Sequence, residues 1–139
     1  MTASDEVRLS VPAMPEFLRL IRVTAAGLGS RLGFSYDEVE DLRLAIDELC
    51  FGLTGATGRL GTVSVRFLVN DDALEVAAEG HFQDSLVTPP ESAWSKVILE
   101  ALVDDHELGT GPGGPRFRLV KRRESAPPQQ PRPPTAATA

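Results

Sequence analysis

The sequence predicts an α+β fold, a two-layer sandwich in which helices pack against a mostly antiparallel sheet. A length of 139 residues suits one domain with a single core. Apolar residues recur at helical spacing in three segments and alternate with polar residues in four others. In chain order these segments read β-α-α-β-β-α-β, and neighbouring strands joined by a short turn favour antiparallel pairing.

The chain begins with a predicted strand and helix. Val7, Leu9 and Val11 alternate with polar residues, which predicts a short strand. Pro15 suits the first turn of a helix, because its fixed φ and missing N–H are tolerated there. Apolar residues at helical spacing continue this helix to about Gly33.

The second helix has the clearest start signal in the sequence. Ser35 and Glu38 form a capping box, in which each side chain accepts a hydrogen bond from the backbone N–H of the other residue. Asp37 is also favourable at the positive end of a helix. Apolar residues at steps of three and four predict the buried face: Val39, Leu42, Ile46, Leu49 and Leu53. The glycine-rich segment 55–61 ends the helix.

The middle of the chain predicts a β-hairpin. Apolar and polar residues alternate over 63–69, which is typical of a half-buried strand. The segment from Asn70 to Asp72 has turn chemistry, and the alternation resumes over 74–78.

A third helix and a last strand are predicted to complete the domain. Residues 94–102 have apolar side chains at helical spacing, and the acidic run 100–107 is placed at the end of this helix. The glycine-rich segment 109–114 predicts a flexible turn. A last strand is expected to end near Arg122, with the basic residues 121–123 as a solvated end.

Composition and charge exclude several classes of protein. The chain has 20 acidic and 14 basic residues, whereas a general nucleic-acid binder needs a clustered lysine and arginine surface. No apolar run reaches the roughly 18 residues that span a bilayer, and the N-terminus lacks the basic start of a signal peptide. A cytoplasmic protein is therefore expected, with the domain at 1–123 and a disordered Pro-rich tail at 124–139.

The cysteine and histidine content predicts no metal site. Cys50 lies between Leu49 and Phe51, which favours a packed thiol over a reactive one. The sequence has two histidines, His81 and His106, and neither lies in an acid–base or metal-ligand motif.

Residues 41–50, Asp-Leu-Arg-Leu-Ala-Ile-Asp-Glu-Leu-Cys, resemble the second helix of bacterial anti-sigma factors. These proteins belong to the GHKL superfamily of histidine kinase-like ATPases, and some are serine kinases that phosphorylate an anti-anti-sigma protein. Residues 22–24 are similar to the family's first helix and residues 117–122 to its final strand. The resemblance covers nearly all of residues 6–123 and implies the histidine kinase-like (Bergerat-type) ATPase fold.

The resemblance also implies a nucleotide site, and its motifs are altered in this chain. Kinase members carry Glu-x-x-x-Asn on the second helix, where the glutamate is the general base and the asparagine oxygen holds Mg²⁺. Glu48 stands at the base position, but Gly52 replaces the asparagine. In the family's Asp-x-Gly-x-Gly box, Ala78 replaces the adenine-binding aspartate, Gly80 matches the first glycine and Phe82 replaces the second.

The phosphate-binding lid of the family is altered as well. A Gly-rich lid would precede the third helix, but residues 86–93, Leu-Val-Thr-Pro-Pro-Glu-Ser-Ala, contain no glycine. We therefore expect no cofactor, and ATP or ADP with Mg²⁺ only if the chain is an active kinase. Glu48 is equally well interpreted as an ordinary charge on the surface of a helix.

The resemblance implies a regulatory binding protein that sequesters a sigma factor and is released by an anti-anti-sigma (STAS-type) protein. Arg22 is the candidate partner contact, with Arg19 and Glu16 on the same helix. A homodimer is implied by the family alone. The acidic runs 37–48 and 100–107 are able to steer basic partner surfaces.

Two alternatives remain open from the sequence. One is an active serine/threonine-protein kinase that phosphorylates an anti-anti-sigma factor, with Glu48 as base and Gly80 in the nucleotide loop. The other is an α+β interaction module with no link to sigma factors.

Overall fold

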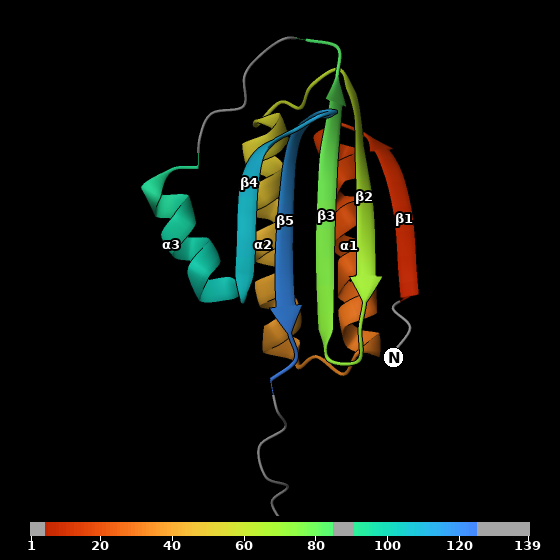
Figure 1. Cartoon of the computed structure of the whole chain (residues 1–139), viewed down its shortest axis with the longest axis vertical. Helices are drawn as coiled ribbons and strands as arrows, with labels where there is room; N and C mark the ends of the chain where they lie inside the picture. The colour runs from red at the N-terminus through yellow and green to blue at the C-terminus, as the bar shows by residue number, and fades with distance from the viewer. Residues whose placement is uncertain (1–4, 85–90, 125–139) are drawn as a thin grey trace, which may run out of the picture.

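The computed structural model of the chain describes residues 5–84 and 91–124 (Figure 1). Its elements are β1 (Asp5–Pro12), α1 (Pro15–Arg31), α2 (Tyr36–Thr54), β2 (Gly61–Val69), β3 (Ala73–Phe82), α3 (Ala93–Leu102), β4 (Asp105–Gly111) and β5 (Gly114–Arg122). The predicted α+β class is confirmed. Nearly all of the predicted tail, residues 125–139, lies outside the described residues. In the described ranges, no helix is long and apolar enough to cross a membrane.

The five strands form one antiparallel sheet with the order β1-β2-β3-β5-β4. Helices α1 and α2 lie behind the sheet in Figure 1, and α3 lies beside the edge strand β4. The face of the sheet that is turned to the viewer carries no helix. The molecule therefore has the predicted two layers, with one sheet face covered and the other open.

The predicted element order was wrong near the C-terminus, where the structure has two strands instead of one. The acidic run 100–107 does not end α3, because the helix ends at Leu102 and Val103 is extended. Residues 105–111 form β4, which pairs with β5. The glycine-rich segment 109–114, predicted to be a turn, supplies the ends of both strands and the tight turn between them.

The core lies between the covered sheet face and the apolar faces of α1 and α2. Its largest fully buried members are Phe67, Phe117, Ile21, Leu42, Ile46, Leu49, Leu53, Leu74, Leu99, Leu119, Val63 and Val65. The predicted apolar face of α2 and the alternation on β2 are confirmed. Cys50 is also buried, so the predicted packed thiol is confirmed, and burial raises its pKa to about 12.

The capping box at the start of α2 is present as predicted. Ser35 Oγ accepts from the Glu38 N–H at 3.1 Å, and Glu38 Oε1 accepts from the Ser35 N–H at 2.9 Å. The other oxygen of Glu38 accepts from the N–H of Glu124, after β5, at 2.9 Å. Burial acts to raise the pKa of Glu38, but the hydrogen bonds from Ser35 and Glu124 lower it overall.

Lys121 is not part of a solvated end, contrary to the prediction for the basic residues 121–123. Alternation along β5 places Lys121 on the same covered face as Phe117 and Leu119, and only 8% of it is exposed. Its Nζ donates to the carbonyl of Leu102 at 2.7 Å and lies 3.7 Å from a carboxylate oxygen of Asp41. Lys121 therefore ties the end of α3 and the side of α2 to β5.

Candidate functional site

Glu48, the candidate general base, lies between α2 and α3. It is half-buried, and its Oε1 accepts a hydrogen bond from the hydroxyl of Ser95 on α3. Ser92 caps α3, because its side chain accepts from the Ser95 N–H at 3.0 Å. The carboxylate is therefore held by a helix that lies 47 positions further along the chain.

Gly52 lies one turn after Glu48 on the same side of α2. A β-carbon at this position would lie 3.3 Å from Cδ2 of Leu108 on β4. The position where the family has a magnesium-binding asparagine therefore faces an apolar side chain. In residues 5–84 and 91–124, no group of three or more His, Cys, Asp or Glu side chains is arranged to hold a metal ion.

The end of β3 carries the residues that align with the adenine-binding box. Ala78 is 3% exposed and Gly80 is buried. The ring of Phe82 folds back against Gly80, so that a β-carbon on Gly80 would overlap the ring. Glu79 alternates to the open face of the sheet, where it lines a hollow with His81. No carboxylate therefore replaces the missing aspartate on the covered face at position 78.

Arg59 completes this region, and sequence reasoning missed it. Its guanidinium lies 4.0 Å from the centre of the Phe82 ring, a cation–π distance. It forms a two-pronged ion pair with Asp84, with Nε 3.1 Å from Oδ2, and Nη1 lies 3.4 Å from the carbonyl of Leu53 at the end of α2. Arg59 thus clamps the Phe82 ring between the ends of α2 and β3. A lone cation in the glycine-rich segment 55–61 gives no signal of this role.

The residues present do not fit a nucleotide with Mg²⁺ in the manner that the resemblance implies. Gly52 supplies no oxygen for a cation, and Ala78 supplies no acceptor for an adenine amine. An aromatic ring and a paired arginine instead occupy the end of β3. The residues of the expected lid lie at 86–93, of which 86–90 are outside the described residues.

The candidate partner contact Arg22 lies at a groove between α1 and α2. Its Nη1 is 2.8 Å from Oδ2 of Asp47, and its Nε is buried with no hydrogen-bond partner among the described residues. The groove has a volume of about 250 Å³, and Arg19 and Phe51 also line it. Glu16 is exposed in the first turn of α1 and is not among the residues that line the groove.

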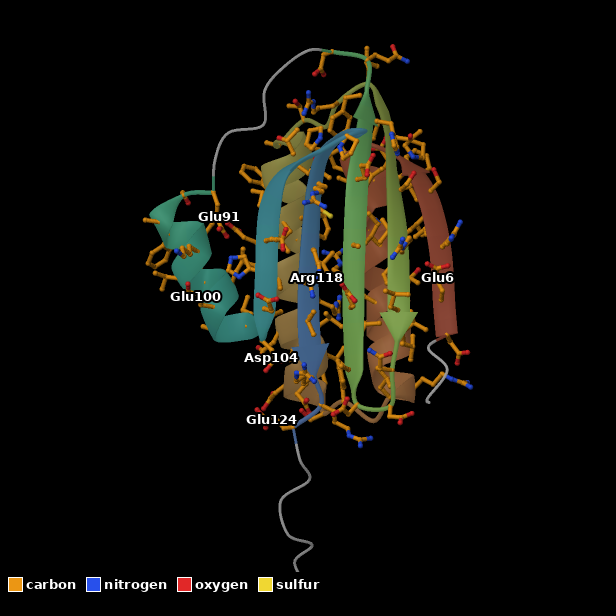
Figure 2. All side chains as sticks on the ribbon, in the orientation of Figure 1. Glu6, Glu91, Glu100, Asp104, Arg118 and Glu124 are labelled. Atoms are coloured by element: carbon orange, nitrogen blue, oxygen red, sulfur yellow. The ribbon has the colours of Figure 1, made fainter. Side chains whose placement is uncertain are left out.

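The open face of the sheet carries charged residues in paired rows (Figure 2). Glu6 pairs with Arg66 at 3.1 Å, and Arg118 pairs with Glu75 at 2.5 Å and Asp105 at 3.0 Å. The hydrogen bond from Arg118 lowers the pKa of Asp105. The hydrogen bonds to Glu75 and Asp105 raise the pKa of Arg118. Positive and negative groups are thus interspersed, and neither sign dominates this face.

The sheet, its two covering helices and α3 form a GHKL-like, histidine kinase-like fold. A solved Mycobacterium tuberculosis structure that contains RsbU and RsbW domains matches with a TM-score of 0.61. The match covers 85% of this chain and 32% of that chain at 20% identity, so this likeness shows the fold alone.

Sequence comparison then gives the family. Serine-protein kinase RsbW of Bacillus cereus (strain Q1) is 32% identical over 127 residues, which are 78% of this chain and 79% of that protein. The chain therefore belongs to the RsbW family. The RsbW proteins of Bacillus pumilus (strain SAFR-032) and Bacillus subtilis (strain 168) are each 42% identical, over 77 and 76 residues.

The similarity to these last two relatives is partial. In each case it covers 52% of this chain and 48% of the relative, so the chain spans about half the length of these curated relatives. No family model matches the chain.

Proposed function

We propose that this chain is an anti-sigma-factor-like regulator that acts by protein contact and binds ATP weakly or not at all. It sequesters a sigma factor in the cytoplasm and keeps it from core RNA polymerase. An anti-anti-sigma protein of the STAS type releases the sigma factor by competing for an overlapping surface. Membership of the RsbW family supports the class of partner, and by the same resemblance we propose that the chain forms a homodimer.

The arrangement of side chains at the end of β3 is the observation that supports weak or absent ATP binding. The Phe82 ring lies against Gly80 under the guanidinium of Arg59, next to an alanine that accepts no hydrogen bond. Phosphoryl transfer depends on a metal clamp and positioned donors, and loss of the clamp removes several kcal/mol of transition-state stabilisation. In this proposal Glu48 serves to hold α3 on α2 through Ser95.

The second candidate function is an active serine/threonine-protein kinase that phosphorylates the anti-anti-sigma protein. The similarity to relatives named serine-protein kinase favours it. Glu48 would then be the general base and Gly80 part of the nucleotide loop. This alternative requires ATP and Mg²⁺ to bind with substituted ligands.

A nucleotide titration followed by thermal unfolding separates the two functions. We expect millimolar ATP or ADP with Mg²⁺ to leave the Tm unchanged within about 1 °C, whereas a ligand at 100 times its Kd stabilises by about 2.7 kcal/mol. Bacillus subtilis RsbW, measured in parallel, is the positive control. A Mg²⁺-dependent rise in Tm would overturn weak or absent ATP binding. Transfer of phosphate from ATP to an anti-anti-sigma protein that is lost in Glu48→Ala would establish the kinase alternative instead.

Titration with sigma factors tests the regulatory function. Each purified sigma factor of the source organism is titrated against the chain, and at least one is expected to bind. Arg22→Ala is expected to weaken that binding by about 10-fold or more, since arginine is frequent among dominant interface residues. Binding that is undiminished would remove Arg22 from the interface.

A second variant distinguishes a direct contact of Arg22 with the sigma factor from an effect of the Arg22–Asp47 ion pair. Asp47→Asn removes the charge that pairs with Arg22 and leaves the guanidinium in the groove. It is therefore expected to bind within about threefold of the wild-type Kd, because a partly exposed ion pair contributes about 0–1 kcal/mol. A loss equal to that of Arg22→Ala would assign the effect to the pairing of α1 with α2.

A further inference from the structure

Helices α2 and α3 expose Tyr36, at the first position of α2, and four further large apolar side chains. Leu44 and Phe51 on α2 are 55% and 59% exposed, and Trp94 and Val97 on α3 are 73% and 60% exposed. Folded domains rarely leave large apolar side chains grouped on the surface unless the group binds something. We call these four residues the α2–α3 face.

The α2 and α3 members of this face are neighbours across a hydrogen bond. Leu44, Glu48 and Phe51 lie at spacings of four and three, and therefore on one side of α2. Glu48 accepts from Ser95, the residue that follows Trp94. The two helices run in opposite directions (Figure 1), so Trp94 lies toward the end of α2 that carries Phe51.

The direction of Trp94 and Val97 can be inferred from the residues of α3 that face the core and β4. Leu99 is 1% exposed and faces the core. Lys96 and Glu100 line a hollow of about 410 Å³ that α3 forms with β4. Trp94 and Val97 are three residues apart, and the 100° step per residue places both on the side of α3 away from the core. Trp94 lies about 100° and Val97 about 160° around the helix from Ser95, the residue that contacts α2.

Acidic side chains border the α2 part of the face. Helix α2 contains six acidic residues and one arginine. Four acidic residues flank the line from Leu44 to Phe51 by helical spacing: Asp37, Glu40, Asp41 and Glu48. Three of these also have partners within the chain, because Glu40 pairs with Arg43, Asp41 lies 3.7 Å from Lys121 and Glu48 accepts from Ser95. An apolar strip with negative borders fits an amphipathic helix whose apolar side is bordered by lysine and arginine.

The α2–α3 face is continuous with the groove that holds Arg22. Phe51 is a member of the face and also lines that groove, together with Arg19 and Arg22. A partner that contacts Arg22 in this groove therefore also reaches Phe51.

We propose that the α2–α3 face binds an amphipathic helix of the sigma factor, with its apolar side against Phe51 and Trp94 and its basic borders against the acidic residues of α2. The proposal rests on the proposed function for the identity of the partner. Large aromatic side chains dominate binding in interfaces of this kind. The negative borders speed association and make it sensitive to salt.

The experiment uses the sigma factor that binds the full-length wild-type chain most tightly in the titration described above. Phe51→Ala and Trp94→Ala are each expected to raise its Kd by about 10- to 30-fold. Leu60→Ala is the matched control, because Leu60 is 69% exposed in the loop between α2 and β2, outside the face. It is expected to leave the Kd within about twofold.

Charge is tested on the same complex by stopped-flow association. Asp37→Asn is expected to slow association, whereas Asp71→Asn, in the turn between β2 and β3, leaves the rate unchanged. Raising the NaCl concentration from about 50 to 300 mM is expected to slow association of the wild type several-fold. The exposed positions of all these side chains predict Tm values within about 2 °C of wild type.

The possible results distinguish a failure of the proposed function from a failure of the proposed role of the α2–α3 face. If no sigma factor binds the wild type, the proposed function is overturned, and with it the partner named here. If a sigma factor binds the wild type, Phe51→Ala and Trp94→Ala with equal affinity, only the present inference is overturned. If those variants instead convert a wild-type dimer to monomers and leave sigma binding unchanged, the face belongs to a second copy of the chain, which also overturns it.

Discussion

Replacing Gly61 with alanine is expected to destabilise the fold by about 3 kcal/mol or more. Gly61 has φ +133°, and a β-carbon there would overlap the backbone carbonyl oxygen of His81. A strained φ/ψ costs about 1–3 kcal/mol, and moving tightly packed groups costs about 1–3 kcal/mol more. The residue begins β2 opposite Phe82, so the substitution also disturbs the strand end that carries the candidate site.

Thermal and urea unfolding measure this effect, and Gly27→Ala is the matched control. Gly27 lies within α1, and a β-carbon there would have no neighbour within 4 Å. The same substitution at Gly27 is therefore expected to stabilise the chain by about 0.5–1 kcal/mol. A Gly61→Ala protein that melts with the wild type would contradict the described backbone at the start of β2.

Replacing Leu49 with alanine is expected to cost about 2–5 kcal/mol, because Leu49 is 1% exposed and its loss leaves a cavity under α2. Leu44→Ala is the same substitution on the same helix. Leu44 is 55% exposed, so its loss is expected to cost less than about 1 kcal/mol of stability. The pair therefore separates the side of α2 that holds the fold together from the side proposed to bind a partner.

The measurement is the free energy of unfolding in urea, with sigma-factor binding recorded for both variants. Leu44→Ala is expected to bind the sigma factor less tightly while its unfolding curve stays close to that of the wild type. Equal losses of stability in the two variants would contradict the difference in burial between these two leucines.

The start, length and buried side of α2 could be predicted because their determinants are local. The capping box needs two residues that are three positions apart, and the apolar face needs only the helical period. The strand β2 was predictable for the same reason, since its buried valines and phenylalanine alternate with polar residues. In each case a few consecutive residues specify the structure.

The strand β4 could not be predicted because its own residues do not favour a strand. Its sequence, Asp-His-Glu-Leu-Gly-Thr-Gly, contains one β-branched residue and two glycines. It becomes a strand because the turn at 111–114 brings it beside β5, with which it forms antiparallel backbone hydrogen bonds. Lys121 shows the same limit, because its burial depends on Leu102 and Asp41, which lie far from it in the sequence.

The sequence singled out individual residues of the candidate site, but it did not predict the contacts that these residues make. The resemblance singled out Glu48 and Phe82, but neither the hydrogen bond to Ser95 nor the cation–π contact with Arg59 follows from the sequence. Each contact joins residues from separate elements, so it exists only once the helices have packed on the sheet.

Glu38 makes one well-defined part of the fold sensitive to acid. Its carboxylate accepts one hydrogen bond from the start of α2 and one from the residue two positions after β5. Because the folded-state pKa lies below the ordinary value of 4.5, ionised Glu38 stabilises the fold at neutral pH. That contribution declines below a pH of about 4.5 and is lost as the pH falls through the lower folded-state pKa. One protonation thus loosens the first turn of a helix and the end of the described chain together.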